Sequence, residues 1–294
     1  MREITVISGK GGTGKTSLTG AFAQLADNHV VCDLDVDAAD LHLLLQPRVE
    51  HVEAFHAGHH AVIRAEDCDD CGLCRDMCRF DAIEQTWDGP VVDRVMCEGC
   101  KVCVHFCPRE AIDFPSNHCG EWYRSHTRFA PMIHARLFPG AENSGLLVSL
   151  LRREARQLAE AEGRELILCD GSPGIGCPVI SSLTGTDLAV AVTEPTPSGR
   201  HDLERVADLC THFGIPLAVI INKHDLNLEN SRAVEEFAAF RGITIAARLP
   251  YDPAFIKAMM AGQVITEFQS GGVADLVRRA WADIQAIGEC RIAA

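Results

Sequence analysis

Eight of the fourteen cysteines in this chain lie in two short stretches that share one spacing. The first stretch, "CDDCGLCRDMCRFDAI", begins at Cys68, and the second, "CEGCKVCVHFCPREAI", begins 29 residues later at Cys97. Both follow the pattern C-x2-C-x2-C-x3-C, which keeps four thiol groups close together along the chain. In a reducing compartment, cysteines clustered in this way indicate metal or redox chemistry rather than a framework of disulfides.

The spacing also distinguishes between the metals that such cysteines bind. Structural zinc sites usually take two pairs of ligands separated by a longer gap. The run seen here is that of two-cluster bacterial ferredoxins, in which the fourth Cys of each run binds the other cluster. We therefore predict two [4Fe–4S] clusters. The first would be held by Cys68, Cys71, Cys74 and Cys107, and the second by Cys97, Cys100, Cys103 and Cys78. Arg79 stands where Pro108 follows the second run, which predicts a more polar or exposed setting for the cluster held by Cys78.

A second kind of chemistry is indicated by "GKGGTGKT", Gly9–Thr16, which matches the P-loop pattern G-x-x-x-x-G-K-[ST]. Its glycines let backbone N–H groups approach phosphate oxygens, and the following helix adds the partial positive charge of its N-terminus. Lys15 should reach the β- and γ-phosphates, and Thr16 should bind Mg²⁺. The predicted nucleotide-binding residues of this loop are Gly9, Lys10, Gly11, Gly12, Thr13, Gly14, Lys15, Thr16 and Ser17.

Lys10 is an additional lysine within the loop, and with it the sequence resembles the MinD/Mrp branch of P-loop ATPases, which also contains the nitrogenase iron protein. In that branch, this lysine reaches the nucleotide of the opposite subunit in a face-to-face dimer. The resemblance implies that Asp35 orients the attacking water and that Asp170 holds the Mg²⁺ shell, with Asp33 or Asp37 assisting through Mg²⁺-bound water. The implied catalytic residues are Lys10, Lys15, Asp35 and Asp170. Because positive charge around the γ-phosphate accelerates phosphoryl transfer, a lysine supplied in trans makes hydrolysis depend on dimerisation.

The segment "INKHD", Ile221–Asp225, leaves the identity of the base open. Asn222, Lys223 and Asp225 fit N-K-x-D, which in GTPases reads guanine through the Asp carboxylate. In the MinD/Mrp branch, an Asn at this strand end contacts adenine. We favour ATP because Lys10 is the more specific signal, and GTP is the alternative.

These residues need a scaffold of alternating strands and helices. The predicted strands are Ile4–Ser8, His29–Asp35, Glu165–Asp170, Asp187–Thr193, Leu217–Asn222 and Ile243–Leu249, with predicted helices at Lys15–Ala26, Leu146–Ala161 and Gly272–Ile287. Strands separated by helices of this length predict an α/β fold with a mostly parallel sheet covered on both faces. The last helix has an apolar stripe but few basic residues, so we expect it to pack against the sheet rather than lie on a membrane.

The cysteine block interrupts this α/β domain. We predict that residues 1–58 form the first part of a P-loop ATPase domain, 59–115 an inserted ferredoxin domain, and 116–294 the second part of the ATPase domain. Residues 116–145 are expected to be rich in loops. The glycine-rich turn after Asp170, with Gly171, Gly174 and Gly176, is expected to rearrange when the γ-phosphate is lost.

The remaining cysteines and histidines are less informative. Cys32 and Cys169 are expected in the core, and Cys210 and Cys290 on helices without chemistry. Cys177 lies on the glycine-rich turn and is a candidate for a further metal, with Cys119 as a loose partner. His56–His60 and His118 lack a convincing ligand spacing.

The composition and net charge of the chain limit the classes of partner that we expect it to bind. The chain has 294 residues and a formal net charge of −14, which argues against general affinity for nucleic acid or anionic lipid. It contains no segment that resembles a membrane span, and its first residues do not resemble a signal peptide, so we expect a cytoplasmic protein without stable membrane insertion.

Taken over its whole length, the sequence resembles MinD-superfamily ATPases that carry an inserted ferredoxin domain. "GEWYRSHTRFAPMIHARL" and "AENSG" resemble the segment after the insert, although Leu146 stands where the family usually has Lys. The resemblance implies an ATP-hydrolysing iron–sulfur protein that couples dimer switching to electron transfer or cluster delivery. Expected partners are a second copy or a related ATPase, and a redox protein or apo-metalloprotein. The alternative is a MinD/ParA-like spatial organiser or cell-division ATPase with structural clusters.

Overall fold

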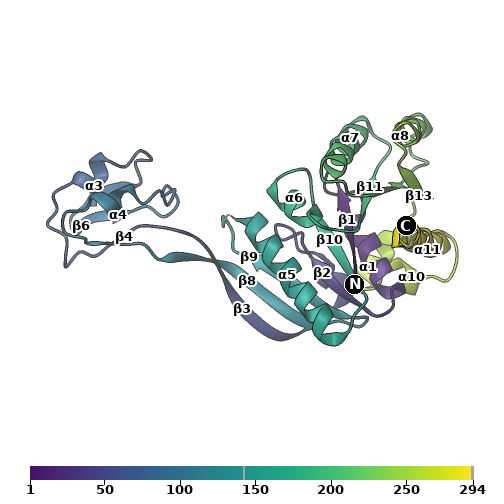
Figure 1. The fold of residues 1–294 in the computed structure, drawn as a ribbon, viewed down its shortest axis with the longest axis horizontal. Helices are drawn as coiled ribbons and strands as arrows, with labels where there is room; N and C mark the ends of the chain where they lie inside the picture. Colours follow the sequence, from purple (N-terminus) through teal and green to yellow (C-terminus); the bar gives the residue numbers. More distant parts are fainter. Residues whose placement is uncertain (142, 293–294) are drawn as a thin grey trace. The chain divides into compact units, whose positions relative to one another are not determined.

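A nine-stranded sheet forms the centre of the larger part of the molecule in the computed structural model, which describes residues 1–141 and 143–292 (Figure 1). Its strands are β1 (Arg2–Ser8), β2 (His29–Asp33), β3 (Arg48–His59), β8 (Ser116–His126), β9 (Pro131–Leu137), β10 (Leu166–Pro173), β11 (Leu188–Thr193), β12 (Leu217–Asn222) and β13 (Thr244–Leu249). Their order is β13-β12-β11-β1-β10-β2-β9-β8-β3. All neighbours from β13 to β9 pair in parallel, which confirms the predicted α/β class with a mostly parallel sheet.

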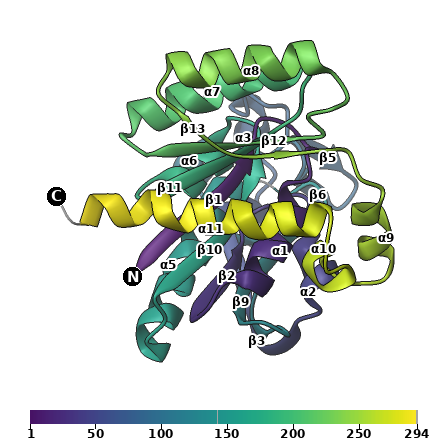
Figure 2. The ribbon, with the colours of Figure 1, turned by 90° about the vertical axis from the view of Figure 1, so that its right-hand side faces the viewer.

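Helices cover both faces of this sheet (Figure 2). They are α1 (Lys15–Leu25), α2 (Leu41–Leu45), α5 (Ser144–Glu162), α6 (Cys177–Leu183), α7 (Pro197–His212), α8 (Leu228–Phe240), α9 (Ala254–Met260), α10 (Ile265–Phe268) and α11 (Val273–Ile292). Successive residues of β1 serve opposite faces, as expected for a strand. Val6 packs in the core beneath α1 and α11, whereas Ile7 packs in the core formed with α6, α7 and α8.

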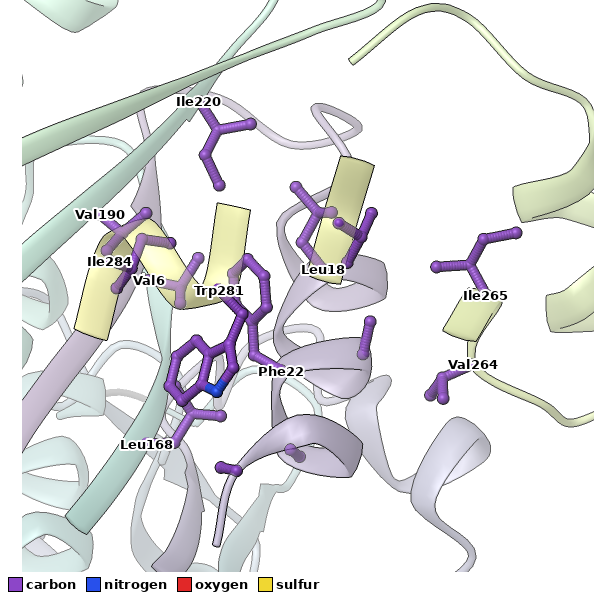
Figure 3. Close-up of a cluster of buried hydrophobic side chains, with 14 of the residues drawn as sticks. Val6, Leu18, Phe22, Leu168, Val190, Ile220, Val264, Ile265, Trp281 and Ile284 are labelled. Atoms are coloured by element: carbon purple, nitrogen blue, oxygen red, sulfur yellow. The ribbon is translucent and has the colours of Figure 1, made fainter. Parts of the chain in front are cut away.

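The last helix packs on the sheet, as its apolar stripe predicts. Trp281 stacks on Phe22 of α1 with ring centroids 5.1 Å apart, close to Val6 and Leu168 (Figure 3). Within the described part of the chain, no helix combines the length and the apolarity required to cross a bilayer. The side chain of Cys290 lies outside the described residues.

The expectation of a loop-rich segment after the cysteine block is wrong. Residues 116–137 form the strands β8 and β9, which are joined by a tight turn in which the Thr127 hydroxyl accepts hydrogen bonds from the N–H groups of Phe129 and Ala130. The polar residues of β8 alternate with buried ones such as Trp122 and Ser125, and Met132 of β9 pairs with Val31 of β2. Exposed and buried side chains alternate along these strands with the period of two that is typical of a sheet. The many charged and polar residues made this alternation hard to recognise in the sequence.

The chain divides into two compact units. The nucleotide unit comprises Met1–Glu53, Glu121–Leu137 and Ser144–Ala294, and the cysteine unit comprises Ala54–Gly120 and Phe138–Asn143. The cysteine unit has only short elements: β4 (Val62–Ile63), α3 (Leu73–Asp76), β5 (Ile83–Thr86), β6 (Gly89–Val92), α4 (Val102–Phe106) and β7 (Ile112–Asp113). Two antiparallel pairs, β4 with β7 and β5 with β6, organise this unit.

Candidate functional site

The loop between β1 and α1 has the backbone that phosphate binding requires. Gly12 and Gly14 have φ angles of 81° and 93°, in the left-handed region that favours glycine. A Cβ at Gly9 would lie 2.1 Å from Asp202 Cβ, and one at Gly14 would lie 2.5 Å from the Asn222 side-chain amide. Larger residues at these positions would therefore displace the surrounding elements.

Four of the predicted catalytic and metal-binding residues meet at the carboxyl ends of β1, β2 and β10. Lys15 Nζ lies 3.0 Å from Asp170 Oδ1 and 3.2 Å from Asp35 Oδ2. Thr16 donates a hydrogen bond of 2.8 Å from its hydroxyl to Asp170 Oδ2. Lys15 and Asp170 are both buried, so their charges interact through little solvent. Burial by itself would lower the pKa of Lys15, but Asp170, Asp35 and Asp33 together raise it, so this lysine stays charged.

Among the described residues, Asp33 forms no salt bridge, whereas Asp35 and Asp170 both form one with Lys15. It is buried, and burial followed by the charge of Asp170 raises its pKa well above the usual range for Asp. Its Oδ1 accepts the N–H of Asp35 at 3.1 Å, whereas its Oδ2 has no hydrogen-bond partner. Burial also raises the pKa of Asp35, although Lys15 opposes that shift. Asp33 therefore shapes the turn that presents Asp35.

Thr19 was not predicted as a site residue, and it donates a further hydrogen bond to the Asp170 carboxylate. Its hydroxyl lies 2.8 Å from Asp170 Oδ1 and 3.0 Å from the carbonyl oxygen of Lys15. The position one helical turn after Lys15 is the sequence signal that could have found it. Asp170 is thus oriented by two threonines and one lysine.

The N-K-x-D segment lies against the P-loop. Asn222 donates from Nδ2 to the carbonyl of Thr13 at 2.7 Å, and its Oδ1 accepts the N–H of Lys223 at 3.0 Å. Asp225 is exposed, and its Oδ1 accepts the N–H of Tyr251 at 2.6 Å. Both polar atoms of Asn222 therefore bind the backbone, whereas Asp225 retains a carboxylate oxygen that faces solvent.

Lys10 is placed away from the other catalytic residues. Its Nζ lies 3.5 Å from Glu194 Oε2, and Lys223 Nζ contacts Glu194 Oε1 as well as the carbonyl of Gly12. The sequence analysis gave no role to Glu194, which lies in the segment Thr193–Pro197 and follows the last residue of β11. No local motif would have indicated it, because its two lysines come from distant segments.

In the cysteine unit, the sequence repeat is also a repeat of backbone conformation. Three pairs of residues, each 29 apart, have nearly equal positive φ angles. They are Asp70 and Gly99 (57° and 60°), Gly72 and Lys101 (73° and 66°), and Asp81 and Glu110 (51° and 50°). The two cysteine runs thus follow the same sharp turns.

The four cysteines that the spacing assigns to the second cluster line one pocket. Cys78 lines a small cavity of about 20 Å³ with Cys97, Cys100 and Cys103, and the wall is completed by apolar side chains such as Phe114. Burial raises the pKa of Cys103 to about 11, with the neighbouring cysteines as lesser causes.

The other set gathers around Cys74. Burial raises the pKa of the Cys74 thiol, and the nearby thiols of Cys68, Cys107 and Cys71 raise it further against an opposing backbone N–H group. These three neighbours are the ligands that the spacing assigns to the same cluster.

Backbone N–H groups approach the sulfur atoms in both runs. Those of Ala82 and Ala111 lie 3.4 Å from the Sγ atoms of Cys78 and Cys107, at the same place in each repeat. Among the described residues, no group of three or more His, Cys, Asp or Glu side chains is arranged to hold a single metal ion.

The secondary metal candidates have other contacts. His56 stacks on His118 with ring centroids 5.1 Å apart, and His60 Nδ1 contacts Asn117 Oδ1. Cys119 is buried, and its thiol donates to the carbonyl of Ala57 at 3.2 Å. Cys177 is exposed at the start of α6. Cys32 and Cys169 are buried and face each other across β2 and β10, as expected for core residues.

A known protein family matches most of the chain. The family model of the CobQ/CobB/MinD/ParA nucleotide binding domain matches residues 4–265. The chain belongs to this family. Protein MJ0578 of Methanocaldococcus jannaschii is 33% identical over 229 residues, which cover 76% of this chain and 79% of that protein. A second protein of that organism, MJ0579, is 23% identical over 230 residues, or 77% of this chain and 82% of that protein.

Solved structures agree on the fold of this MinD/ParA-type chain. The cell division ATPase MinD of Pyrococcus furiosus superposes with a TM-score of 0.58 at 17% identity, covering 97% of this chain and 99% of that one. MinD of Pyrococcus horikoshii, which was solved with Mg-ADP, also gives 0.58 at 17% identity and covers 100% of this chain and 98% of its own. At this identity, the likeness establishes the fold of a P-loop nucleotide-binding protein.

Proposed function

We propose that this protein is a P-loop ATPase whose nucleotide cycle controls two [4Fe–4S] clusters. The single observation that carries the proposal is the cavity lined by Cys78 together with Cys97, Cys100 and Cys103 in a chain that also has an assembled P-loop. In crossed ligation, each cluster would take ligands from both cysteine runs. The P-loop would supply a nucleotide cycle that could act on the two clusters.

For nucleotide hydrolysis, each residue of the site would have a role that follows from its position. Lys15 would leave Asp35 and Asp170 to contact the β- and γ-phosphates, and Thr16 would bind Mg²⁺, with Asp170 in its hydration shell. Asp35, released from Lys15, would orient the attacking water. Lys10 would complete the charge around the γ-phosphate of a second subunit, in a homodimer or in a heterodimer with a related ATPase. The Mg-ADP complex of the Pyrococcus horikoshii MinD supports ATP and Mg²⁺ as the ligands.

For the clusters, the residues present fit the group. Each of the two sets offers four thiolates, and the N–H groups of Ala82 and Ala111 would stabilise negative charge on sulfur. Apolar side chains such as Phe80 and Phe114 exclude water from one side of the Cys78 cavity. When bound, such clusters supply one-electron chemistry, so the partner would be a redox protein or an apo-metalloprotein that receives a cluster.

One observation favours GTP as a second candidate nucleotide. Both polar atoms of Asn222 bind the backbone, so this side chain has little capacity left to read adenine. Asp225 is exposed, and a carboxylate complements the N–H donors of guanine. ATP stays our first choice because Lys10 marks the MinD branch.

Structural similarity to MinD favours the alternative of a spatial organiser with structural clusters. A MinC:MinD cell division complex of Aquifex aeolicus superposes with a TM-score of 0.56 at 15% identity, covering 97% of this chain and 96% of that one. A pure organiser has no need for redox-active clusters, so the two functions differ in what loss of the clusters does.

The test is anaerobic purification with iron and sulfide counts, followed by EPR with and without ATP. We expect about eight irons per chain and a reduced-cluster signal that changes on adding ATP. Fewer than about six irons would contradict two clusters. If the Cys68→Ser variant retains the full function of the wild-type protein, the alternative of a spatial organiser would be favoured.

A further inference from the structure

Glu194 links three segments around the P-loop that are distant in sequence. It directly follows β11, and its side chain is only 15% exposed. Its Oε2 lies 3.5 Å from Lys10 Nζ, and its Oε1 contacts Lys223 Nζ. One carboxylate thus serves a lysine of the P-loop and a lysine of the loop after β12.

The turn that carries Glu194 is fixed by its own hydrogen bonds. The N–H of Thr196 donates to the Glu194 carbonyl at 2.8 Å, and the N–H of Gly199 donates to Thr196 Oγ1 at 3.0 Å. Thr193 closes the turn by donating from its hydroxyl to the Gly199 carbonyl at 3.0 Å. A Cβ at Gly199 would lie 2.5 Å from the Glu194 carbonyl oxygen, so the turn is closely packed. The carboxylate is therefore presented from a rigid support.

Among the described residues, the polar partners of the Lys10 amine all belong to this turn. Besides Glu194, its Nζ lies 3.4 Å from the hydroxyls of Thr196 and Ser198. The side chain is 33% exposed, so it can leave without unpacking a core. An amine held on its own subunit cannot at the same time reach a phosphate on another one.

We propose that Glu194 is the positioning residue that holds Lys10 on its own subunit until a triphosphate-bound dimer forms. This inference rests on the proposed function, in which Lys10 acts in trans. Lys223 has a complementary role, because it keeps Glu194 paired after Lys10 has left. Release of Lys10 then costs one partly exposed ion pair and leaves no unpaired carboxylate behind.

Two substitutions should move Lys10 in opposite directions. Glu194→Gln removes the carboxylate charge, so the Lys10 amine should react with acetic anhydride about two- to fivefold faster in nucleotide-free protein, the range expected for one such ion pair. Lys223→Ala removes the second lysine that contacts Glu194. Lys10 should then pair more strongly with this carboxylate and react more slowly with acetic anhydride. Peptide mass spectrometry measures both rates, with the exposed Lys257 as an internal reference. A merely structural role for Glu194 would loosen the loop in both variants and speed both reactions.

The second measurement is the dimer dissociation constant with the β,γ-imido analogue of ATP, by analytical ultracentrifugation. Glu194→Gln should lower it about two- to fivefold, whereas Glu204→Gln, which removes an exposed pair with Arg200 on α7, should not change it. Unchanged Lys10 reactivity, or unchanged dimerisation despite faster reaction, would overturn the proposal. If the wild-type protein forms no dimer with the analogue, the trans mechanism itself fails, whereas the reactivity test still decides whether Glu194 restrains Lys10.

Discussion

The two units of this protein hold their reactive groups in contrasting ways. In the nucleotide unit, Lys15 at the start of α1 and Asp170 of β10 are both buried, and they form an ion pair in the absence of any ligand. In the cysteine unit, Cys74 and Cys103 lie on helices of only four and five residues, and the other six cysteines of the two runs lie outside helices. Cys71 and Cys100 are exposed.

The difference extends to the cores. The largest fully buried side chains of the described residues, such as Phe22, Leu151 and Met132, all belong to the nucleotide unit. The cysteine unit buries mainly small residues, such as Ala82 and Ala111. Small units with little apolar core usually need a metal or disulfides for stability. The comparison implies that the nucleotide unit is preorganised by protein contacts, whereas the cysteine unit depends on what its thiols bind.

The largest expected effect therefore concerns the cysteine unit alone. Cys103→Ser should remove about half of the iron and make the segment 54–120 sensitive to protease, because the cavity with Cys78 loses a ligand. The nucleotide unit should keep its unfolding transition. Iron analysis and limited proteolysis under anaerobic conditions measure the two effects. Cys177→Ser, at an exposed cysteine of the other unit, is the control and should keep the full iron content. Equal protease resistance in both variants would contradict the dependence on thiol ligands.

An effect of intermediate size should come from buried histidines in the nucleotide unit. Burial, assisted by Arg164, lowers the pKa of His29 to about 4, and burial does the same for His134. The unfolded chain takes up these protons near pH 6.5, but the folded chain resists them until about pH 4. The free energy of unfolding should therefore fall as pH decreases through this window, by up to about 1.4 kcal/mol per pH unit for each histidine.

Urea unfolding of the nucleotide unit between pH 7 and pH 5, followed by circular dichroism, measures this slope. His29→Gln should reduce the slope, whereas the exposed His212→Gln should keep it. A slope that is the same in wild type and His29→Gln would show that His29 is not held neutral in the folded state.

The sequence predicted those features whose signals are local. The P-loop and the cysteine sets follow from spacing within a few residues, and the parallel sheet follows from apolar runs such as the one ending at Asp170. The strands β8 and β9 were missed because charged residues alternate with Trp122 and other buried side chains. Glu194 was missed because its contacts with Lys10 and Lys223 join segments that only the folded sheet brings together. Local sequence motifs were thus recognisable, but long-range contacts between distant segments were not.

The smallest expected effect tests how far the preorganised nucleotide site also selects its base. Asp225 is exposed and binds the N–H of Tyr251 through one oxygen only. If adenine is the base, Asp225→Ala should change the ATP dissociation constant by no more than about twofold, the size typical of exposed groups. If guanine is the base, the same variant loses a charged hydrogen-bond acceptor, and GTP affinity should fall about tenfold or more.

Competition between ATP and GTP, measured by calorimetry for wild type, Asp225→Ala and the exposed control Glu229→Ala, separates these cases. A GTP preference that disappears only in Asp225→Ala would mean that the site selects its nucleotide by a solvent-facing carboxylate. The nucleotide unit would then combine a buried phosphate site around Lys15 and Asp170 with an exposed base site at Asp225, so the contrast between the two units would also exist within one of them.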